Sequence, residues 1–264
     1  MQALQPFPEN SLVNPERKAG MRSTASVLTS PYDPIAAWYD EGIRREGSIH
    51  DLVLPGLLEL IGNIRGSKIC DLACGQGVLA RRLAGQGAHV VGVDLSLELL
   101  QIAQREEHAD PLGITYLQDD AQHLQGLANT TFDGVVCNLA LMDIAHLPNA
   151  ASTIWRILRP GGWFVFALIH PCAPISSAEG TLLHAFHDYF EEGFWCSSNP
   201  SSVRGRVGAY HRTLSTYLNS FLTVGLCLER VMEPQATGPF AARIEGYDRV
   251  PVVFSAKWRK AINP

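Results

Sequence analysis

The sequence predicts an α/β fold in which one doubly wound, mostly parallel sheet of seven strands lies between helices. The main observation is that short apolar stretches alternate with amphipathic helical stretches between residues 68 and 169, a pattern typical of parallel sheets. A second observation is the glycine-containing turn that joins the first apolar stretch to the first helical one. Two more apolar stretches after residue 225 complete the predicted sheet.

The predicted elements follow in order along residues 31–264, which we interpret as one domain after a disordered tail over residues 1–30. Cap helices are expected over residues 31–62, where leucines recur at three- and four-residue spacings. The expected strands cover residues 68–72, 89–93, 114–118, 132–137, 163–169, 226–232 and 249–258. The expected helices after the first strand cover residues 78–86, 96–108, 147–158 and 213–224.

The turn after the first strand is the most informative segment. The run from Lys68 to Gly77 reads as a strand ending on Asp71, followed by Cys-Gly-Gln-Gly and then a helix. Gly75 and Gly77 let the backbone approach a ligand where a Cβ atom would collide. The first N–H groups of the helix have no partner within it and point toward such a ligand. The segment therefore predicts a site for an adenosine-containing cofactor.

The acid before the glycines separates two cofactor classes. Gly75, Gly77 and Ala80 also fit a dinucleotide fingerprint, and Asp94 follows at about the 20-residue distance expected of a ribose-binding acid. A dinucleotide would place its pyrophosphate beside Asp71, and such a like-charge contact costs several kcal/mol in a partly buried site. S-adenosylmethionine carries an ammonium group and a cationic sulfur instead. Asp71 therefore favours S-adenosylmethionine.

Three further features lie at the intervals that this interpretation requires. The second strand ends in Asp94, which is suited to accept hydrogen bonds from both ribose hydroxyls. The third strand leads to Asp120 and Ala121, where an adenine amino group can be received. Residues 158–162, Leu-Arg-Pro-Gly-Gly, end a helix before the fifth strand. Ligands of such sheets bind beyond the carboxyl ends of the strands, where Asn138 and His170 also fall.

Together these motifs resemble the class I S-adenosylmethionine-dependent methyltransferase family, and in particular its bacterial small-molecule (type 11 or UbiE-like) members, over residues 66–170. The resemblance implies a Rossmann-like sheet whose last strand is antiparallel. It also implies that a tyrosine of the Tyr32–Asp40 segment contacts the methionine carboxylate. The cofactor-binding residues expected on this basis are Tyr32, Tyr39, Asp71, Ala73, Gly75, Gly77, Asp94, Leu95, Asp120, Ala121, Asn138 and Leu139.

Residues 171–212 break the alternation and are rich in aromatic side chains. Because this segment follows the fifth strand, we expect it to fold over the cofactor as a lid, with an extra core layer or a dimer surface as the alternatives. His170 at the strand end and His211 are the candidate catalytic bases or substrate contacts. His184 and His187 are weaker candidates. A structural role is a plausible alternative for each of these histidines.

The composition restricts which classes of molecule are expected to bind this protein. The formal net charge is −5 with no basic stripe, so nucleic acid is not expected as a substrate. No apolar run of membrane-spanning length and no signal-peptide stretch occurs, so we expect a soluble, cytoplasmic protein without a membrane partner. We further expect a monomer or homodimer that acts on a small-molecule substrate. The six cysteines include no Cys-x-x-Cys pair, and we interpret them as reduced packing residues rather than metal ligands.

The function predicted from the sequence is S-adenosylmethionine-dependent methyl transfer to an O, N or C atom of a small aromatic or apolar metabolite. Asn138 is followed by Leu-Ala-Leu, which argues against methylation of the amino groups of nucleic-acid bases or glutamine. Two alternatives remain open. One is a methyltransferase-like protein that binds the cofactor without transfer, as a scaffold or in a cyclisation. The other is an NAD-dependent oxidoreductase, although no hydride-accepting dyad and no second nicotinamide-binding half is evident.

Overall fold

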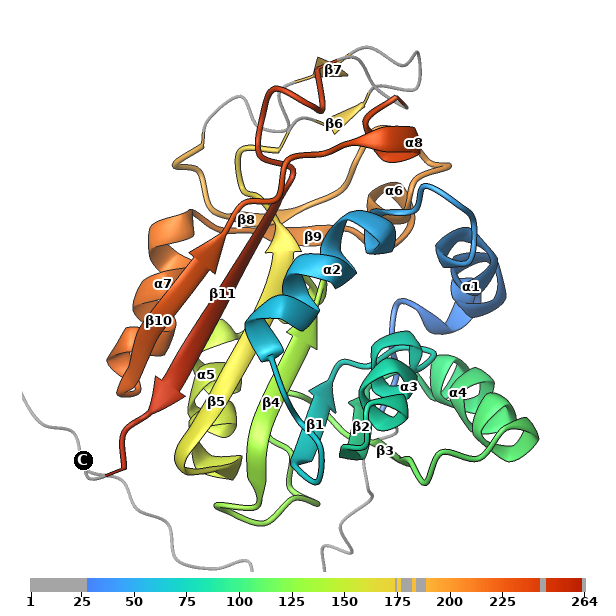
Figure 1. Ribbon diagram of the computed structural model, residues 1–264. Coiled ribbons are helices and arrows are strands. Elements are labelled where there is room, and N and C mark those ends of the chain that lie inside the picture. Colours follow the sequence, from blue (N-terminus) through green and yellow to red (C-terminus); the bar gives the residue numbers. More distant parts are fainter. Residues whose placement is uncertain (1–27, 174, 177–181, 184–188, 243–245, 263–264) are drawn as a thin grey trace, which may run out of the picture.

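The computed structural model describes residues 28–173, 175–176, 182–183, 189–242 and 246–262. A seven-stranded sheet forms its centre, in the order β10-β11-β5-β4-β1-β2-β3 (Figure 1). Its strands are β1 (Lys68–Leu72), β2 (His89–Asp94), β3 (Thr115–Gln118), β4 (Phe132–Asn138), β5 (Leu158–Ile169), β10 (Leu226–Met232) and β11 (Val253–Lys260). β11 runs in the direction opposite to the other six strands, so the predicted fold class is confirmed.

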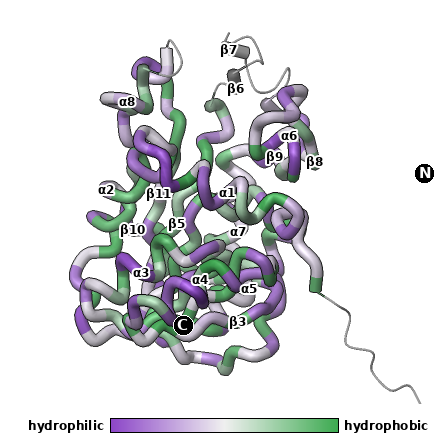
Figure 2. The backbone as a smooth tube through the Cα atoms, turned by 90° about the vertical axis from the view of Figure 1, so that its right-hand side faces the viewer, coloured by the Kyte–Doolittle hydropathy of each residue, from purple (hydrophilic) through white to green (hydrophobic). Residues whose placement is uncertain are grey.

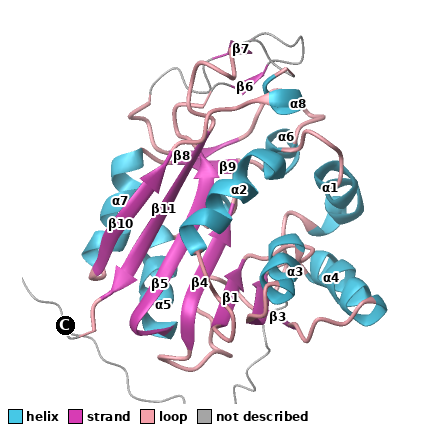
Figure 3. Ribbon diagram, viewed as in Figure 1, coloured by secondary structure: helices cyan, strands magenta, loops and turns pink. Residues whose placement is uncertain are grey.

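Helices cover both faces of the sheet (Figure 3). On one face lie α2 (Ile49–Ile61), α3 (Val78–Gly85) and α4 (Leu97–Ala109), and on the other lie α5 (Leu147–Ile157) and α7 (Leu214–Thr223). Because side chains alternate along a strand, β5 contributes to two cores. Its Phe164 and Phe166 belong to the cluster on the α5 side, and Val165 and Ala167 to the cluster on the α2 side.

Several element ends differ from the sequence prediction. β5 begins at Leu158 rather than at residue 163, because Leu158 already pairs with Phe132 of β4. The glycine pair that suggested a turn there lies inside a register shift between Phe132 and Gly134 of β4, where Gly161 has φ of 76°. β11 begins at Val253 rather than at residue 249. The remaining strands and helices agree with the predicted ranges within one or two residues.

Smaller elements gather at the carboxyl ends of the parallel strands. β8 (Gly193–Trp195), α6 (Val203–Val207) and β9 (Ala209–His211) lie at this end in both Figure 1 and Figure 2, which are views 90° apart. The other small elements are η1 (Asp33–Ile35), α1 (Ala36–Ile43), η2 (Leu141–Asp143), β6 (Ile175–Ser176), β7 (Leu182–Leu183) and α8 (Gly238–Ala241).

Some predictions fall outside the described residues. They are the tail up to residue 27, the part of the expected lid that includes His184 and His187, and residues 243–245 and 263–264. All six cysteines are described and free of disulfides. Cys172, Cys196 and Cys227 are exposed, so the predicted packing role is wrong for these three. In the described parts of the chain, no helix has the length and apolarity needed to cross a membrane.

Candidate functional site

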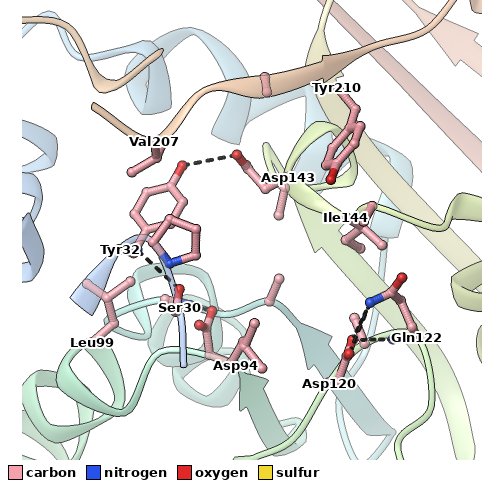
Figure 4. A pocket seen from close by; sticks show the side chains of 18 of the residues that line it. Ser30, Tyr32, Asp94, Leu99, Asp120, Gln122, Asp143, Ile144, Val207 and Tyr210 are labelled. Atoms are coloured by element: carbon pink, nitrogen blue, oxygen red, sulfur yellow. Dashed lines mark hydrogen bonds between the residues drawn. The ribbon is translucent and has the colours of Figure 1, made fainter. Parts of the chain in front are cut away.

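A cavity of about 440 Å³, which we call the first cavity, opens at the carboxyl ends of β1, β2, β3 and β4 (Figure 4). Its volume lies in the range of small-molecule sites. Its walls come from the segment Ser30–Tyr39, from the four strand ends and from residues 194–210. Nine of the predicted cofactor residues line it: Tyr32, Tyr39, Ala73, Gly75, Asp94, Leu95, Asp120, Ala121 and Asn138. The other three, Asp71, Gly77 and Leu139, are not part of its lining.

The first turn bends through left-handed backbone at three positions. Ala73, Gly75 and Gly77 have φ values of 55°, 57° and 84°. Gly75 faces the cavity, as predicted from the need for close backbone approach. Gly77 has a different reason to be glycine, because a Cβ atom there would overlap the Tyr116 hydroxyl. The close approach at Gly77 is therefore made by a protein side chain.

Asp94 is held in place by the turn that it faces. One carboxylate oxygen accepts the Gly75 N–H at 2.7 Å and the other accepts the Ser96 N–H at 2.7 Å. Burial raises the pKa of Asp94 to about 6, although both backbone bonds favour the ionised form. Each carboxylate oxygen offers about two lone-pair sites, so both can still accept from a ligand.

Two polar oxygens near this turn lack partners. Asp71 is only 1% exposed, and its Oδ2 accepts no hydrogen bond. Burial, and then the nearby Asp94 charge, raise the pKa of Asp71 to about 8. The buried Oδ1 of Asn138, which lines the cavity, is also without a partner. Buried acceptors without donors favour a ligand that brings donors or positive charge.

At the opposite side of the cavity, Asp120 and Gln122 fix the loop after β3. One Asp120 oxygen accepts from the Gln122 backbone N–H at 2.8 Å, and the Gln122 side-chain amide donates to the same carboxylate at 3.0 Å (Figure 4). The side-chain amide oxygen of Gln122 accepts the His146 backbone N–H at 2.8 Å. Asp120 is therefore oriented by the loop after η2 through Gln122, a residue that the sequence analysis did not select.

The N-terminal segment is attached to the cavity by polar contacts. Asp33 accepts the Ser96 hydroxyl at 2.6 Å, and Ser96 in turn caps α4. The Tyr32 hydroxyl donates to Asp143 at 3.4 Å (Figure 4), and Asp143 forms an ion pair with Arg204 of α6. This pair joins the N-terminal segment, η2 and the predicted lid. Neither Asp143 nor Arg204 was predicted as a site residue.

A second, smaller cavity of about 140 Å³ lies beside the first and contains both candidate catalytic histidines. The two cavities share Ala209 and Tyr210 in their linings. Figure 4 shows the Tyr210 ring directed into the first cavity from β9. Tyr210 therefore forms part of the wall between them.

His170 has both ring nitrogens engaged. Its Nδ1 accepts the Cys172 N–H at 3.0 Å, so Nε2 carries the proton and donates to Glu233 at 3.1 Å. Burial lowers the pKa of His170, while Glu233 acts in the opposite direction. In this arrangement the neutral ring has no lone pair directed at a substrate. His211 Nε2 lies 2.9 Å from the Tyr189 carbonyl oxygen, which can only accept, so this nitrogen also carries a proton.

Comparison with known proteins agrees with the geometry of the first cavity. A family model described as a methyltransferase domain matches residues 70–166, which contain the first turn and Asp94, Asp120 and Asn138. A crystal structure of an S-adenosylmethionine-dependent methyltransferase from Mesorhizobium loti aligns with a TM-score of 0.65 and 29% identity, over 78% of this chain and 96% of that one. The chain is thus similar to S-adenosylmethionine-dependent methyltransferases, and the matched residues include the strand ends that form the first cavity.

Curated relatives of this chain include two ubiquinone biosynthesis O-methyltransferases. The protein from Alkalilimnicola ehrlichii is 31% identical over 165 residues, covering 60% of this chain and 66% of the relative. The protein from Paracidovorax citrulli is 32% identical over 121 residues, covering 44% of this chain and 49% of the relative. The chain thus spans less than two thirds of the length of either relative.

The cofactor of the family, S-adenosylmethionine, fits the charge of the first cavity. Four aspartates line it, namely Asp94, Asp119, Asp120 and Asp143, and no lysine, arginine or histidine of the described chain does. A cationic sulfonium and an ammonium group suit such a lining, whereas a pyrophosphate does not. The unpartnered oxygens of Asp71 and Asn138 agree with this preference.

Proposed function

We propose that this methyltransferase transfers a methyl group to an oxygen, nitrogen or carbon atom of a small aromatic or apolar metabolite. The observation that carries the proposal is a pair of cavities with a shared wall. One has the acidic lining that suits the cofactor, and the other is lined by Trp195, Tyr210 and Tyr217 at the same edge of the sheet. Because the two relatives are named as O-methyltransferases, oxygen is the first acceptor atom to test.

In this proposal, residues at the ends of different strands bind different parts of the cofactor. Asp94 accepts hydrogen bonds from the ribose hydroxyls, and Leu95 packs beside it. Asp120 and Ala121 receive the adenine. Gly75, like Ala73, brings backbone close to the methionine end, where Asn138 offers its unpartnered amide oxygen.

The remaining five residues act from the rim of that lining or from outside it. Tyr32 and Tyr39 close the cavity from the N-terminal segment, with ring centroids 5.0 Å apart. Asp71 acts through its buried carboxyl group with an unpartnered oxygen, Gly77 through the shape of the turn and Leu139 through its left-handed backbone, with φ of 57°. A non-glycine residue held in that region next to Asn138 indicates backbone strain at the cavity.

The protein has little covalent chemistry to perform. When bound, S-adenosylmethionine supplies a methyl carbon on a cationic sulfur, and the carbon–sulfur electron pair returns to sulfur as the acceptor's lone pair bonds to the methyl. The protein positions the acceptor in line and excludes water, which supplies much of the rate. His170 fits a substrate contact better than a base, because its lone pair accepts the Cys172 N–H. A base is needed only for an acceptor that must lose a proton.

The proposal is tested by incubating the purified protein with methyl-tritiated S-adenosylmethionine and a small-molecule cell extract. We expect tritium in a low-molecular-weight product. Calorimetric titration with S-adenosylmethionine and with NAD accompanies the assay. Tight binding of S-adenosylmethionine without any transfer would contradict the proposal and favour a non-transferring binder. Binding of NAD in its place would favour an oxidoreductase.

The contribution of His170 is tested with His170→Ala. We expect turnover to fall at least about tenfold while cofactor affinity stays near wild type, since His170 lines the second cavity and not the first. His89→Ala is the matched control, because His89 is exposed at the start of β2 and lines neither cavity. Undiminished turnover in His170→Ala would remove His170 from the mechanism.

A further inference from the structure

The two cavities carry opposite charge. The described lining of the second cavity contains Arg204, Arg212, His170 and His211, and no aspartate or glutamate. The first cavity has the reverse composition, with four aspartates and no basic side chain. Since a cationic cofactor suits the first, the second is arranged for a ligand of the opposite sign.

Three of the four basic groups already have an acidic neighbour. Arg204 is paired with Asp143, and His170 with Glu233. Glu192 lies close enough to His211 for the imidazole to favour the ionised carboxylate. These contacts leave Arg212 as the basic group of the second cavity whose charge is not matched by a described carboxylate.

Arg212 is only 8% exposed and is held firmly. Its guanidinium donates to the carbonyl oxygens of Leu141, Ile144 and Ala145 at 3.3, 2.7 and 2.8 Å. Three of the five N–H donors of an arginine are thereby used. The guanidinium also lies 5.0 Å from the ring centroid of Tyr210 and 5.9 Å from that of Tyr217.

A purely structural role accounts for only part of this arrangement. The three carbonyl bonds explain how Arg212 fixes the loop after η2. A neutral donor could make such bonds without the desolvation penalty of a buried cation. Arg212 also lines the second cavity, and a carboxylate matches a guanidinium in both charge and planar geometry.

The size of the second cavity restricts the rest of the ligand. Its volume of about 140 Å³ is close to that of an apolar cavity that holds one benzene ring, about 150 Å³. Trp195, Tyr210 and Tyr217 supply aromatic surface around it. One planar ring with a small substituent therefore fits.

We propose that the methyl acceptor is a small aromatic carboxylate whose carboxylate binds Arg212, so that Arg212 determines acceptor specificity. This inference rests on the proposed function, because it assigns the second cavity to the acceptor. The carboxylate is the recognised group and is not the methylated one, so the product keeps its negative charge. Tyr210 borders both cavities, so it lies beside the acceptor ring and beside the cofactor.

The test uses three probes with the same ring and different charge: benzoate, benzamide and benzylamine. Each is titrated by calorimetry into the protein saturated with S-adenosylhomocysteine. We expect benzoate to bind at least tenfold more tightly than benzamide, and benzylamine no better than benzamide. In Arg212→Gln the preference for benzoate should fall to less than twofold, and Arg212→Lys should retain part of it. Arg249→Gln, which changes an exposed arginine that lines neither cavity, should leave the preference intact.

The wild-type measurement alone can overturn the inference, should Arg212→Gln fail to fold. Equal affinity for benzoate and benzamide, or no binding of benzoate, contradicts it. The tritium-transfer assay then tests the proposed function independently of the binding measurements. Labelled product that an anion exchanger does not retain would leave methyl transfer standing and refute the carboxylate acceptor. Benzoate preference without any transfer would keep the anion site and refute the methyltransferase activity.

Discussion

The two cavities of this protein differ in origin as well as in charge. The floor of the first is built from the ends of β1 to β4, whose residues lie almost wholly within the range that matches the methyltransferase family model. The second is built mainly from residues after Ile169, beyond that match. Regular strand ends thus supply the acidic cofactor cavity, and an irregular insertion supplies the basic one. Under the proposed assignment, the sheet determines the choice of cofactor and the segment that follows β5 determines the choice of acceptor.

The ion pair between Asp143 and Arg204 joins an acidic residue of the first cavity to a basic residue of the second. Breaking it should give the largest loss of stability. Asp143→Leu leaves Arg204 without its carboxylate, and we expect a loss of unfolding free energy of about 3 kcal/mol. This is the low end for a buried pair, because the side chains remain 22% and 20% exposed. Urea denaturation measures the loss.

A double variant separates the loss of the pair from the loss of packing. Asp143→Leu combined with Arg204→Met removes both charges, and we expect it to recover most of the stability lost in the single variant. If the double variant is no more stable than the single one, an unpaired Arg204 charge does not explain the loss. The charge boundary between the cavities would then be unimportant for stability.

The acidic character of the first cavity is tested by Asp94→Ala. We expect cofactor affinity to fall by about 1–3 kcal/mol through the loss of charge-assisted hydrogen bonds to the ribose. Glu98→Gln is the matched control, since Glu98 is an exposed carboxylate at the start of α4, shortly after Asp94, and lines neither cavity. Calorimetry with S-adenosylmethionine measures both. Unchanged affinity for S-adenosylmethionine in Asp94→Ala would contradict the proposal that Asp94 binds the ribose hydroxyls.

The buried carboxyl group of Asp71, beneath the first turn, should make the free energy of unfolding depend on pH. The pKa of Asp71 is raised in the folded protein to about 8, whereas an unfolded aspartate titrates near its ordinary value of about 3.9. The folded state therefore binds the proton more tightly. The resulting stabilisation is fully present below about pH 4 and is lost as the pH rises toward 8.

One such group gives a slope of at most about 1.4 kcal/mol per pH unit. Urea denaturation of the cofactor-free protein between pH 6.5 and pH 8, above the raised pKa of Asp94, should show falling stability, and Asp71→Asn should flatten the slope. Asp133→Asn is unsuitable as a control because its carboxylate binds the Lys68 N–H, so Glu98→Gln serves again. A slope that persists in Asp71→Asn would assign the pH dependence to another group.

Much of the first cavity could be predicted from sequence, because its residues sit at regular places in the chain. Asp94, Asp120 and Asn138 each stand at or just after the end of an apolar strand, and parallel strands end at one edge of the sheet. Gly75 follows from the same logic. The start of β5 was misjudged because a Pro-Gly-Gly run signals a turn locally, while pairing with Phe132 extends the strand through it.

Most residues of the second cavity could not be predicted from the sequence in this way. Arg212 gains its position from carbonyl groups 67 to 71 residues earlier in the chain, and no local pattern encodes those contacts. Asp143 and Arg204 likewise meet only after folding, 61 residues apart. The histidines were selected as chemical groups, but their hydrogen-bond partners could not be inferred. Their catalytic role stays a prediction.

The attachment of the segment Ser30–Tyr39 has a consequence for ligand exchange. Within η1 and α1 only Ala36 is buried, and Asp33 and Tyr32 tether the segment through hydrogen bonds rather than through an apolar core. Such a wall opens at a lower free energy than the sheet beneath it. A ligand enclosed by it binds only the closed form, so occupancy and closure reinforce each other. Hydrogen exchange of the backbone amides in residues 30–43 should therefore slow when S-adenosylmethionine binds. The rate of that exchange would then report whether the first cavity is occupied.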